Sequence, residues 1–143
     1  AVLPFMLKNS ESHIVVVSSI MGKFGAPLRS SYAAAKHGLH GFFDTLRAEL
    51  KSENIKILLV CPGFVRTNIS KNALVADGSH QGTMDAATEK GFTPEHVAQK
   101  IIRAIENNKA EIVIAGVREK LAVYLKRFAP SLLRRMVQNA KTT

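Results

Sequence analysis

The sequence HIVVV at residues 13–17, followed directly by SSIMGKFGAPLRSSYAAAK at residues 18–36, decides the fold of this chain. A continuous apolar run is typical of a parallel strand that is covered on both faces. Glycine and proline mark a loop at residues 20–30, and the spacing of apolar residues predicts a helix over residues 31–52. This order predicts an α/β fold in which Ser19 lies at the end of a strand.

Tyr32 and Lys36 lie four residues apart in this helix, so a phenol and an ammonium share one helix face. A tyrosine hydroxyl has a reference pKa of about 10, and a neighbouring cation lowers that pKa by favouring the phenolate. Such a tyrosine can exchange a proton with a substrate near neutral pH, and the Ser19 hydroxyl can hold the substrate oxygen. The alternative is a surface helix on which the two residues are neighbours by chance, since Tyr-x-x-x-Lys alone is common.

Two further apolar runs, at residues 55–61 and 110–115, predict two more strands. The helix between them is expected to begin with Thr93 as N-cap and Pro94 in the first turn, and to end at Asn107-Asn108. Strands alternating with helices predict a parallel sheet with right-handed crossovers. The apolar residues of the first long helix that are expected to face the sheet are Leu39, Phe42, Phe43, Leu46 and Leu50.

The second strand ends sharply at Pro62-Gly63, within the segment PGFVRT at residues 62–67. Functional residues of open α/β sheets gather at the carboxyl ends of the strands. Ser19 and this segment are therefore expected to meet at one edge of the sheet.

Ser19, Tyr32, Lys36, the small-residue helix and the PGFVRT segment together resemble the short-chain dehydrogenase/reductase superfamily over nearly the whole chain. The resemblance implies the C-terminal part of a Rossmann-like, doubly wound parallel sheet of three strands with flanking helices. It also implies an NAD(P)-dependent oxidoreductase that interconverts a carbonyl and an alcohol. Tyr32 would be the acid/base, Lys36 would lower the pKa of Tyr32 and bind ribose, and Ser19 would orient the substrate oxygen.

The same resemblance implies the cofactor contacts, which are Tyr32, Lys36, Pro62, Gly63, Val65 and Thr67. AVLPFMLK at residues 1–8 and the basic C-terminus most resemble the member 7B branch of the dehydrogenase/reductases. That branch favours NADP(H) over NAD and implies the endoplasmic reticulum or another intracellular membrane, with the cytoplasm as the alternative. The family implies a homodimer, and the apolar lid and tail described below favour a small lipophilic carbonyl or alcohol substrate.

One family element is missing from the sequence, which contains no strand–G-x-x-x-G-x-G–helix unit of the kind that binds a pyrophosphate. The chain also starts at Ala1 rather than Met. We therefore expect a C-terminal portion of an oxidoreductase whose strand at residues 14–17 has an unpaired edge. The alternative function is a catalytically incompetent, truncated product that acts as an interaction or oligomerisation module.

Composition limits the other classes. The chain has 143 residues, 46% of them hydrophobic, which is enough for one buried core. Its net charge of +9 suits an anionic partner, but no nucleic-acid-binding signature accompanies that charge, so nucleic acid is not expected as a partner. Cys61 is the single cysteine and is expected in the core. The histidines lack metal-ligand spacing, so no metal is expected, and His37 and His40 are expected to face solvent or substrate.

Two segments lie outside this framework. Residues 68–92 are polar and glycine-bearing, and are interpreted as a mobile lid that covers the substrate; a disordered connector is the alternative. Residues 117–143 form a basic amphipathic tail that is expected to be helical on both sides of Pro130. Its apolar stripe either packs on the substrate pocket or the dimer partner, or binds a membrane surface through residues 117–141.

Overall fold

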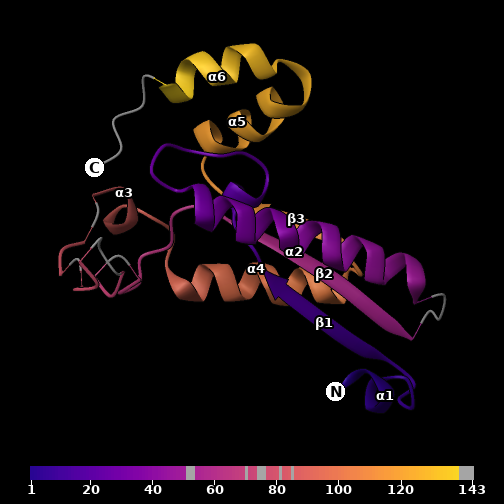
Figure 1. Ribbon diagram of the computed structural model, residues 1–143. Coiled ribbons are helices and arrows are strands. Elements are labelled where there is room, and N and C mark those ends of the chain that lie inside the picture. Colours follow the sequence, from indigo (N-terminus) through magenta and orange to yellow (C-terminus); the bar gives the residue numbers. More distant parts are fainter. Residues whose placement is uncertain (51–53, 70, 74–76, 81, 85, 139–143) are drawn as a thin grey trace.

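The computed structural model describes residues 1–50, 54–69, 71–73, 77–80, 82–84 and 86–138. Three strands, β1 (Ser12–Val17), β2 (Ile55–Pro62) and β3 (Glu111–Ile114), form a parallel sheet in the order β1-β2-β3 (Figure 1). Val17 pairs with Val60, and Pro62 pairs with Ile114. The predicted parallel α/β architecture is thus confirmed.

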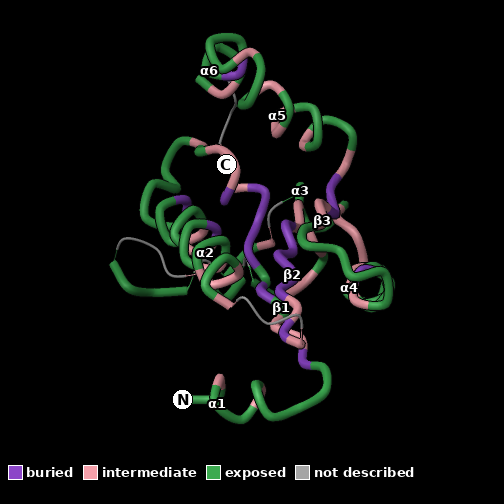
Figure 2. Tube along the Cα trace, turned by 90° about the vertical axis from the view of Figure 1, so that its right-hand side faces the viewer, coloured by how far each residue is buried: buried purple, intermediate pink, exposed green. Residues whose placement is uncertain are grey.

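Two long helices cover the sheet from opposite sides, as Figure 2 shows: α2 (Ser30–Glu49) and α4 (Pro94–Glu106). Successive side chains of a strand point to opposite faces, so β2 supplies both halves of the core. Ile57 and Leu59 pack on the α2 side, whereas Leu58 and Val60 pack on the α4 side. The central position of β2 explains why its side chains are the most deeply buried of the described residues.

Local capping signals set the ends of α4 as predicted. The Thr93 hydroxyl accepts a hydrogen bond from the His96 N–H at 3.2 Å, and Pro94 occupies the first helical position. The helix ends at Glu106 with Asn107 as C-cap, and Asn108 follows with a positive φ of 49°. Asparagine tolerates this left-handed conformation better than most residues do.

Two predictions about burial were wrong. The β1 strand is covered on the α2 side only, because α4 lies over β2 and β3; Val15 and Val17 are 36% and 54% exposed. Phe42 is 63% exposed, while Leu39 and Phe43 of the same helix do pack against the sheet. The edge position predicted for β1 is confirmed.

The remaining elements lie around this core. They are α1 (Leu3–Met6), the 3-10 helix η1 (Ile20–Gly22), α3 (Ala86–Glu89), α5 (Val117–Phe128) and α6 (Pro130–Gln138). Helices α5 and α6 form a hairpin on the side of the molecule where the strands end (Figure 1). The predicted lid includes residues 70, 74–76, 81 and 85, and the predicted tail includes residues 139–143, all of which lie outside the described residues. Among the described residues, no helix has the length and apolar character to cross a membrane.

Candidate active site

The residues that follow the three strands lie in line, as parallel pairing requires. The Ser18 N–H donates to the Val60 carbonyl at 2.8 Å, and the Gly63 N–H donates to the Ile114 carbonyl at 2.8 Å. Ser19 and Pro62-Gly63 therefore stand at the same edge of the sheet, as predicted. This edge is where open α/β sheets hold their ligands.

Ser19 turns the chain from β1 into η1. Its backbone is extended, and its Oγ caps η1 by accepting the Met21 N–H at 3.1 Å. The side chain is largely buried. Because the hydroxyl accepts this bond, its O–H remains a donor for an oxygen placed beside the end of β1.

Tyr32 and Lys36 occupy the first turns of α2. The Lys36 Nζ lies 5.6 Å from the centroid of the Tyr32 ring, within cation–π range. The same ammonium donates to the Val17 carbonyl at 3.1 Å, which fixes it at the end of β1, two residues before Ser19. Tyr32 is 39% exposed, so a small molecule can reach its ring. The structure thus brings Lys36 to Tyr32 on one side and to the end of β1 on the other.

The segment after β2 runs away from this group toward α4. Val65 forms a parallel bridge with Phe92, the Arg66 N–H donates to the Phe92 carbonyl at 2.9 Å, and the Phe92 N–H donates to the Phe64 carbonyl at 3.0 Å. A Cβ on Gly91 would lie 2.5 Å from the Phe64 oxygen, so this approach requires glycine. The Thr67 Oγ1 accepts the Ile69 N–H at 3.4 Å. Pro62 and Gly63 therefore lie at the carboxyl ends of the strands. Val65 and Thr67 lie in the segment that connects β2 to α4.

A buried polar cluster lies behind these residues, and sequence reasoning missed it. His40 is buried, not directed to solvent or substrate as predicted, and its Nε2 lies 3.0 Å from the Ser18 Oγ and 3.6 Å from the Cys61 Sγ. Burial lowers the pKa of His40 below its ordinary value. A signal was available: Tyr32, Lys36 and His40 recur every four residues, which places His40 on the helix face that turns toward β1.

The far side of this cluster is charged. The His40 Nδ1 is buried and lies 3.7 Å from a Glu111 carboxylate oxygen. That carboxylate pairs with the Lys23 ammonium at 2.5 Å. Potential metal ligands on His40, Cys61 and Glu111 lie within 4.8 Å of one another. Burial, however, raises the pKa of the Cys61 thiol to about 11, and Lys23 already supplies a cation to Glu111, so we assign no metal to this group.

Comparison with known proteins places this chain in a family. The sequence profile of the short chain dehydrogenases matches residues 1–77. The dehydrogenase/reductase SDR family member 7B of Xenopus tropicalis is 47% identical over 92% of this chain and 43% of its own length. The Bos taurus protein of the same name is 44% identical over 96% of this chain and 42% of its own length. The predicted likeness to the member 7B branch is therefore confirmed, and the chain spans about two-fifths of the length of these relatives.

Solved structures show the same fold. A short chain dehydrogenase/reductase from Burkholderia phymatum in complex with NAD has a TM-score of 0.72 at 21% identity, and the match covers 96% of this chain and 53% of that one. A short chain dehydrogenase from Burkholderia cenocepacia J2315 in complex with NADP has a TM-score of 0.68 at 20% identity, and covers 89% of this chain and 48% of that one. With a family profile matched over more than half of its length, this chain belongs to the short-chain dehydrogenase family.

Proposed function

We propose that the whole protein is an NAD(P)-dependent oxidoreductase that interconverts a carbonyl and an alcohol. One observation carries the proposal: the Lys36 ammonium stands beside the Tyr32 ring and is tied to the Val17 carbonyl at the end of β1. Membership of the short-chain dehydrogenase family supports it. The acid/base group and the cation thus come from one helix, α2, and the hydroxyl donor comes from Ser19 at the end of β1.

Each side chain has a distinct role in this proposal. Tyr32 gives a proton to the substrate oxygen in reduction and takes it back in oxidation. Lys36 stabilises the phenolate by its charge and donates to the ribose hydroxyls. Ser19 donates its O–H to the substrate oxygen and so holds the carbonyl in place. A nicotinamide held by these residues would supply the hydride to the carbonyl carbon, or accept it from the alcohol.

We assign the cofactor side of the site to Tyr32 and Lys36 together with Pro62, Gly63, Val65 and Thr67. The residues suit a nicotinamide, because Thr67 uses its oxygen as an acceptor and keeps its O–H to donate to a carboxamide. The two Burkholderia structures hold NAD and NADP respectively. Resemblance to the member 7B branch favours NADP(H) for this protein.

The proposed substrate is a small lipophilic carbonyl or alcohol. Phe64, which follows shortly after β2, and Ile69, at the start of the segment proposed as a lid (residues 68–92), are exposed large apolar residues. Apolar side chains beside a few polar groups are typical of small-molecule sites. The resemblance to member 7B supports a location at the endoplasmic reticulum or another intracellular membrane. Residues 117–141 of the basic tail are the part that we propose to contact the bilayer.

A second candidate function is a non-catalytic interaction module. The observation that favours it is the edge position of β1 in the described sheet, on a strand whose Val15 and Val17 are also exposed. Exposed edge strands readily pair with other chains. Specific binding of NADPH by the 143-residue chain, together with a compact dimer in gel filtration, would oppose this candidate; large soluble aggregates without cofactor binding would favour it.

The test of the oxidoreductase proposal is Tyr32→Phe in the whole protein, with Tyr124→Phe as the matched control. Tyr124 is the other tyrosine of this chain and lies exposed on α5. Reduction of the aromatic diketone phenanthrenequinone is followed by consumption of NADPH. We expect kcat to fall about 10²- to 10⁴-fold in Tyr32→Phe, with the fold intact by circular dichroism, and to stay near wild type in the control. Wild-type turnover in Tyr32→Phe would remove this residue from the acid/base role.

A further inference from the structure

We propose that His40 is a positioning residue that locks the end of β1 against the helix carrying Tyr32 and Lys36. This inference rests on the proposed oxidoreductase function. The feature behind it is the buried cluster of Ser18, His40 and Cys61 with Glu111 and Lys23, which lies directly beneath the candidate catalytic residues.

The hydrogen bonds define a direction through the cluster. The Ser18 hydroxyl lies 3.3 Å from the Lys36 carbonyl and 3.0 Å from the His40 Nε2. A carbonyl can only accept, so Ser18 uses its one proton for the Lys36 carbonyl. As part of this proposal we assign the His40 proton to Nε2, which then donates it to the Ser18 oxygen. The chain of donors runs from His40 through Ser18 to the backbone of Lys36.

Tight packing keeps the imidazole in this position. A Cβ on Gly22 would lie 2.6 Å from the Ser18 Oγ, 2.7 Å from the His40 Nε2 and 2.8 Å from the His40 Cδ2. The backbone of η1 therefore closes directly over the hydrogen bond, and Cys61 of β2 closes it from another side. With this little free space, the imidazole has a single orientation. Because η1 passes so close to this hydrogen bond, position 22 requires glycine.

Lys36 is consequently held at the end of β1 by two bonds. Its ammonium donates to the Val17 carbonyl, and its own carbonyl accepts from Ser18. Ser18 is also the residue next to Ser19. Loss of the His40 donor leaves Ser18 free to rotate, which shifts Lys36 on one side and Ser19 on the other. Misplacement of catalytic groups by about 1 Å can lower a rate by about a hundredfold.

The charges around His40 favour its neutral form. Lys23 follows η1 and opposes protonation, Glu111 of β3 and Asp44 of α2 favour it, and His37 of α2 opposes it. Cys61 of β2 is a protonated thiol. Burial and Lys23 outweigh the carboxylates, so the pKa of His40 lies below its ordinary value of 6.5. Protonation at acid pH adds a donor on Nδ1 that faces Glu111 and competes with Lys23 for it, which disturbs the cluster.

The experiment compares two substitutions of His40 in the whole protein with the diketone assay. In His40→Gln the side-chain amide can replace the Nε2 donor but cannot titrate. In His40→Leu the donor is lost. We expect kcat to fall about ten- to a hundredfold in His40→Leu, with KM for NADPH raised less than in Lys36→Ala, and kcat to be largely restored in His40→Gln. The matched control is His13→Gln, a partly buried histidine at the other end of β1.

A pH profile separates positioning from simple structural support. Wild-type kcat is expected to decline at acid pH as His40 takes up a proton, and this decline is absent in His40→Gln. Should His40→Leu fail to fold, Ser18→Ala breaks the same chain of bonds with a smaller change and is expected to lower kcat in the same way. Wild-type kcat in Ser18→Ala, or an acid decline of kcat in His40→Gln equal to that of wild type, overturns the inference. Stoichiometric binding of Zn²⁺ that is lost in His40→Gln also overturns it, in favour of a metal site.

The two proposals fail in distinguishable ways. Absence of NADPH-dependent turnover in the wild-type protein would contradict the oxidoreductase proposal itself, whereas wild-type turnover by Tyr32→Phe would contradict only the acid/base role of Tyr32. An inactive Tyr32→Phe beside a His40→Leu variant with wild-type kcat would contradict the positioning role alone.

Discussion

At the scale of single residues, the candidate site depends on contacts that a side chain of one more carbon would break. Gly22 is the clearest case, because its hydrogen faces the bond between Ser18 and His40. Gly38, on the neighbouring helix, has open space where a Cβ would stand. The two positions therefore differ: an added Cβ would meet Ser18 and His40 at Gly22 and open space at Gly38.

The first prediction concerns these two glycines. Gly22→Ala pushes a methyl group against Ser18 and His40, and we expect the free energy of unfolding to fall by about 1–3 kcal/mol, with a lower kcat. Gly38→Ala is the control, since alanine is more favourable than glycine within a helix by up to about 1 kcal/mol. Urea unfolding of both variants measures the difference. Equal stability in Gly22→Ala and wild type would mean that η1 does not close tightly over the cluster.

The second prediction concerns the pH dependence of stability. An unfolded histidine takes up a proton near 6.5, whereas burial lowers the pKa of folded His40. The unfolded state therefore binds more protons in this range, so this contribution to stability is complete above pH 6.5 and is lost as pH falls from 6.5 toward the folded pKa. Urea unfolding between about pH 8 and about pH 5 should show a smaller acid loss in His40→Gln than in wild type. Identical slopes would contradict the buried neutral imidazole.

At the scale of elements, the parts that local chemistry defines could be predicted from the sequence. Thr93, Pro94 and Asn107 act on their own neighbours, so the ends of α4 followed from the sequence. The exposure of Phe42 did not follow, because periodicity indicates an apolar face without showing how much of it the sheet covers. His40 was missed for a related reason: Lys23 and Glu111 meet it only after β3 has joined the sheet.

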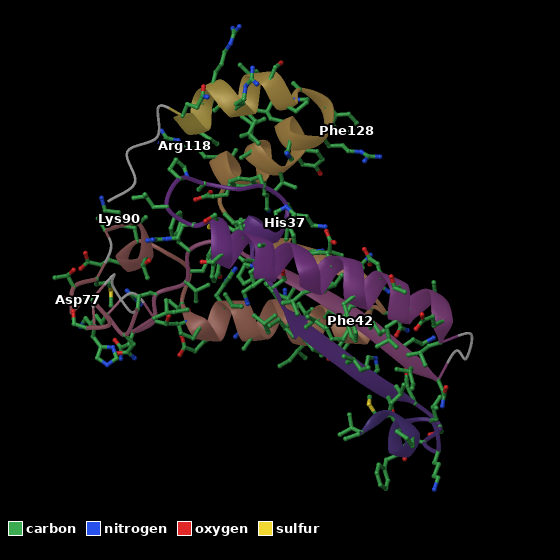
Figure 3. The ribbon with its side chains drawn as sticks, in the orientation of Figure 1. His37, Phe42, Asp77, Lys90, Arg118 and Phe128 are labelled. Atoms are coloured by element: carbon green, nitrogen blue, oxygen red, sulfur yellow. The ribbon has the colours of Figure 1, made fainter. Side chains whose placement is uncertain are left out.

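Helix α5 carries an unusual surface for its size. Val117, Leu121, Tyr124 and Phe128 recur at i, i+4, i+7 and i+11, so they share one helix face, and all four are exposed. Arg118, Lys120, Lys126 and Arg127 stand on the same helix (Figure 3 shows Arg118 and Phe128 at its opposite ends). An exposed apolar stripe with basic residues on the same helix suits an anionic bilayer surface.

The third prediction tests this surface. The double variant Tyr124→Ser and Phe128→Ser should lose flotation with vesicles containing phosphatidylserine, because it removes apolar area that enters the interface. Wild type should float with these vesicles and much less with neutral phosphatidylcholine vesicles. Ile102→Ser, an exposed apolar position on α4, is the matched control. Equal flotation of wild type and the double variant would exclude a membrane role for α5.

At the scale of the whole molecule, the face of α2 that turns away from the sheet is the best candidate for contact between two copies. Gly38 and Gly41 leave open space there, and Phe42 stands exposed beside them. Small residues next to an exposed aromatic ring allow two helices to approach closely. This arrangement supports the homodimer that the family resemblance implies.

The fourth prediction follows from this face. Phe42→Ser in the whole protein should shift the sedimentation distribution from dimer toward monomer, because a central aromatic contact is lost. Phe5→Ser, an equally exposed phenylalanine on α1, serves as the control and should sediment like wild type. A Phe42→Ser protein that stays fully dimeric would place the interface elsewhere.

The central claim is that Lys36, held at the end of β1, contacts both a nicotinamide cofactor and Tyr32. Its most direct test is the titration of NADPH into the whole protein, followed by cofactor fluorescence, for wild type, Lys36→Ala and the control Lys109→Ala. Lys109 is exposed just before β3, at the other end of that strand from Gly63. We predict that binding weakens about ten- to a hundredfold in Lys36→Ala alone, as expected for lost hydrogen bonds from a charged group. Equal NADPH affinity in all three proteins would contradict the claim.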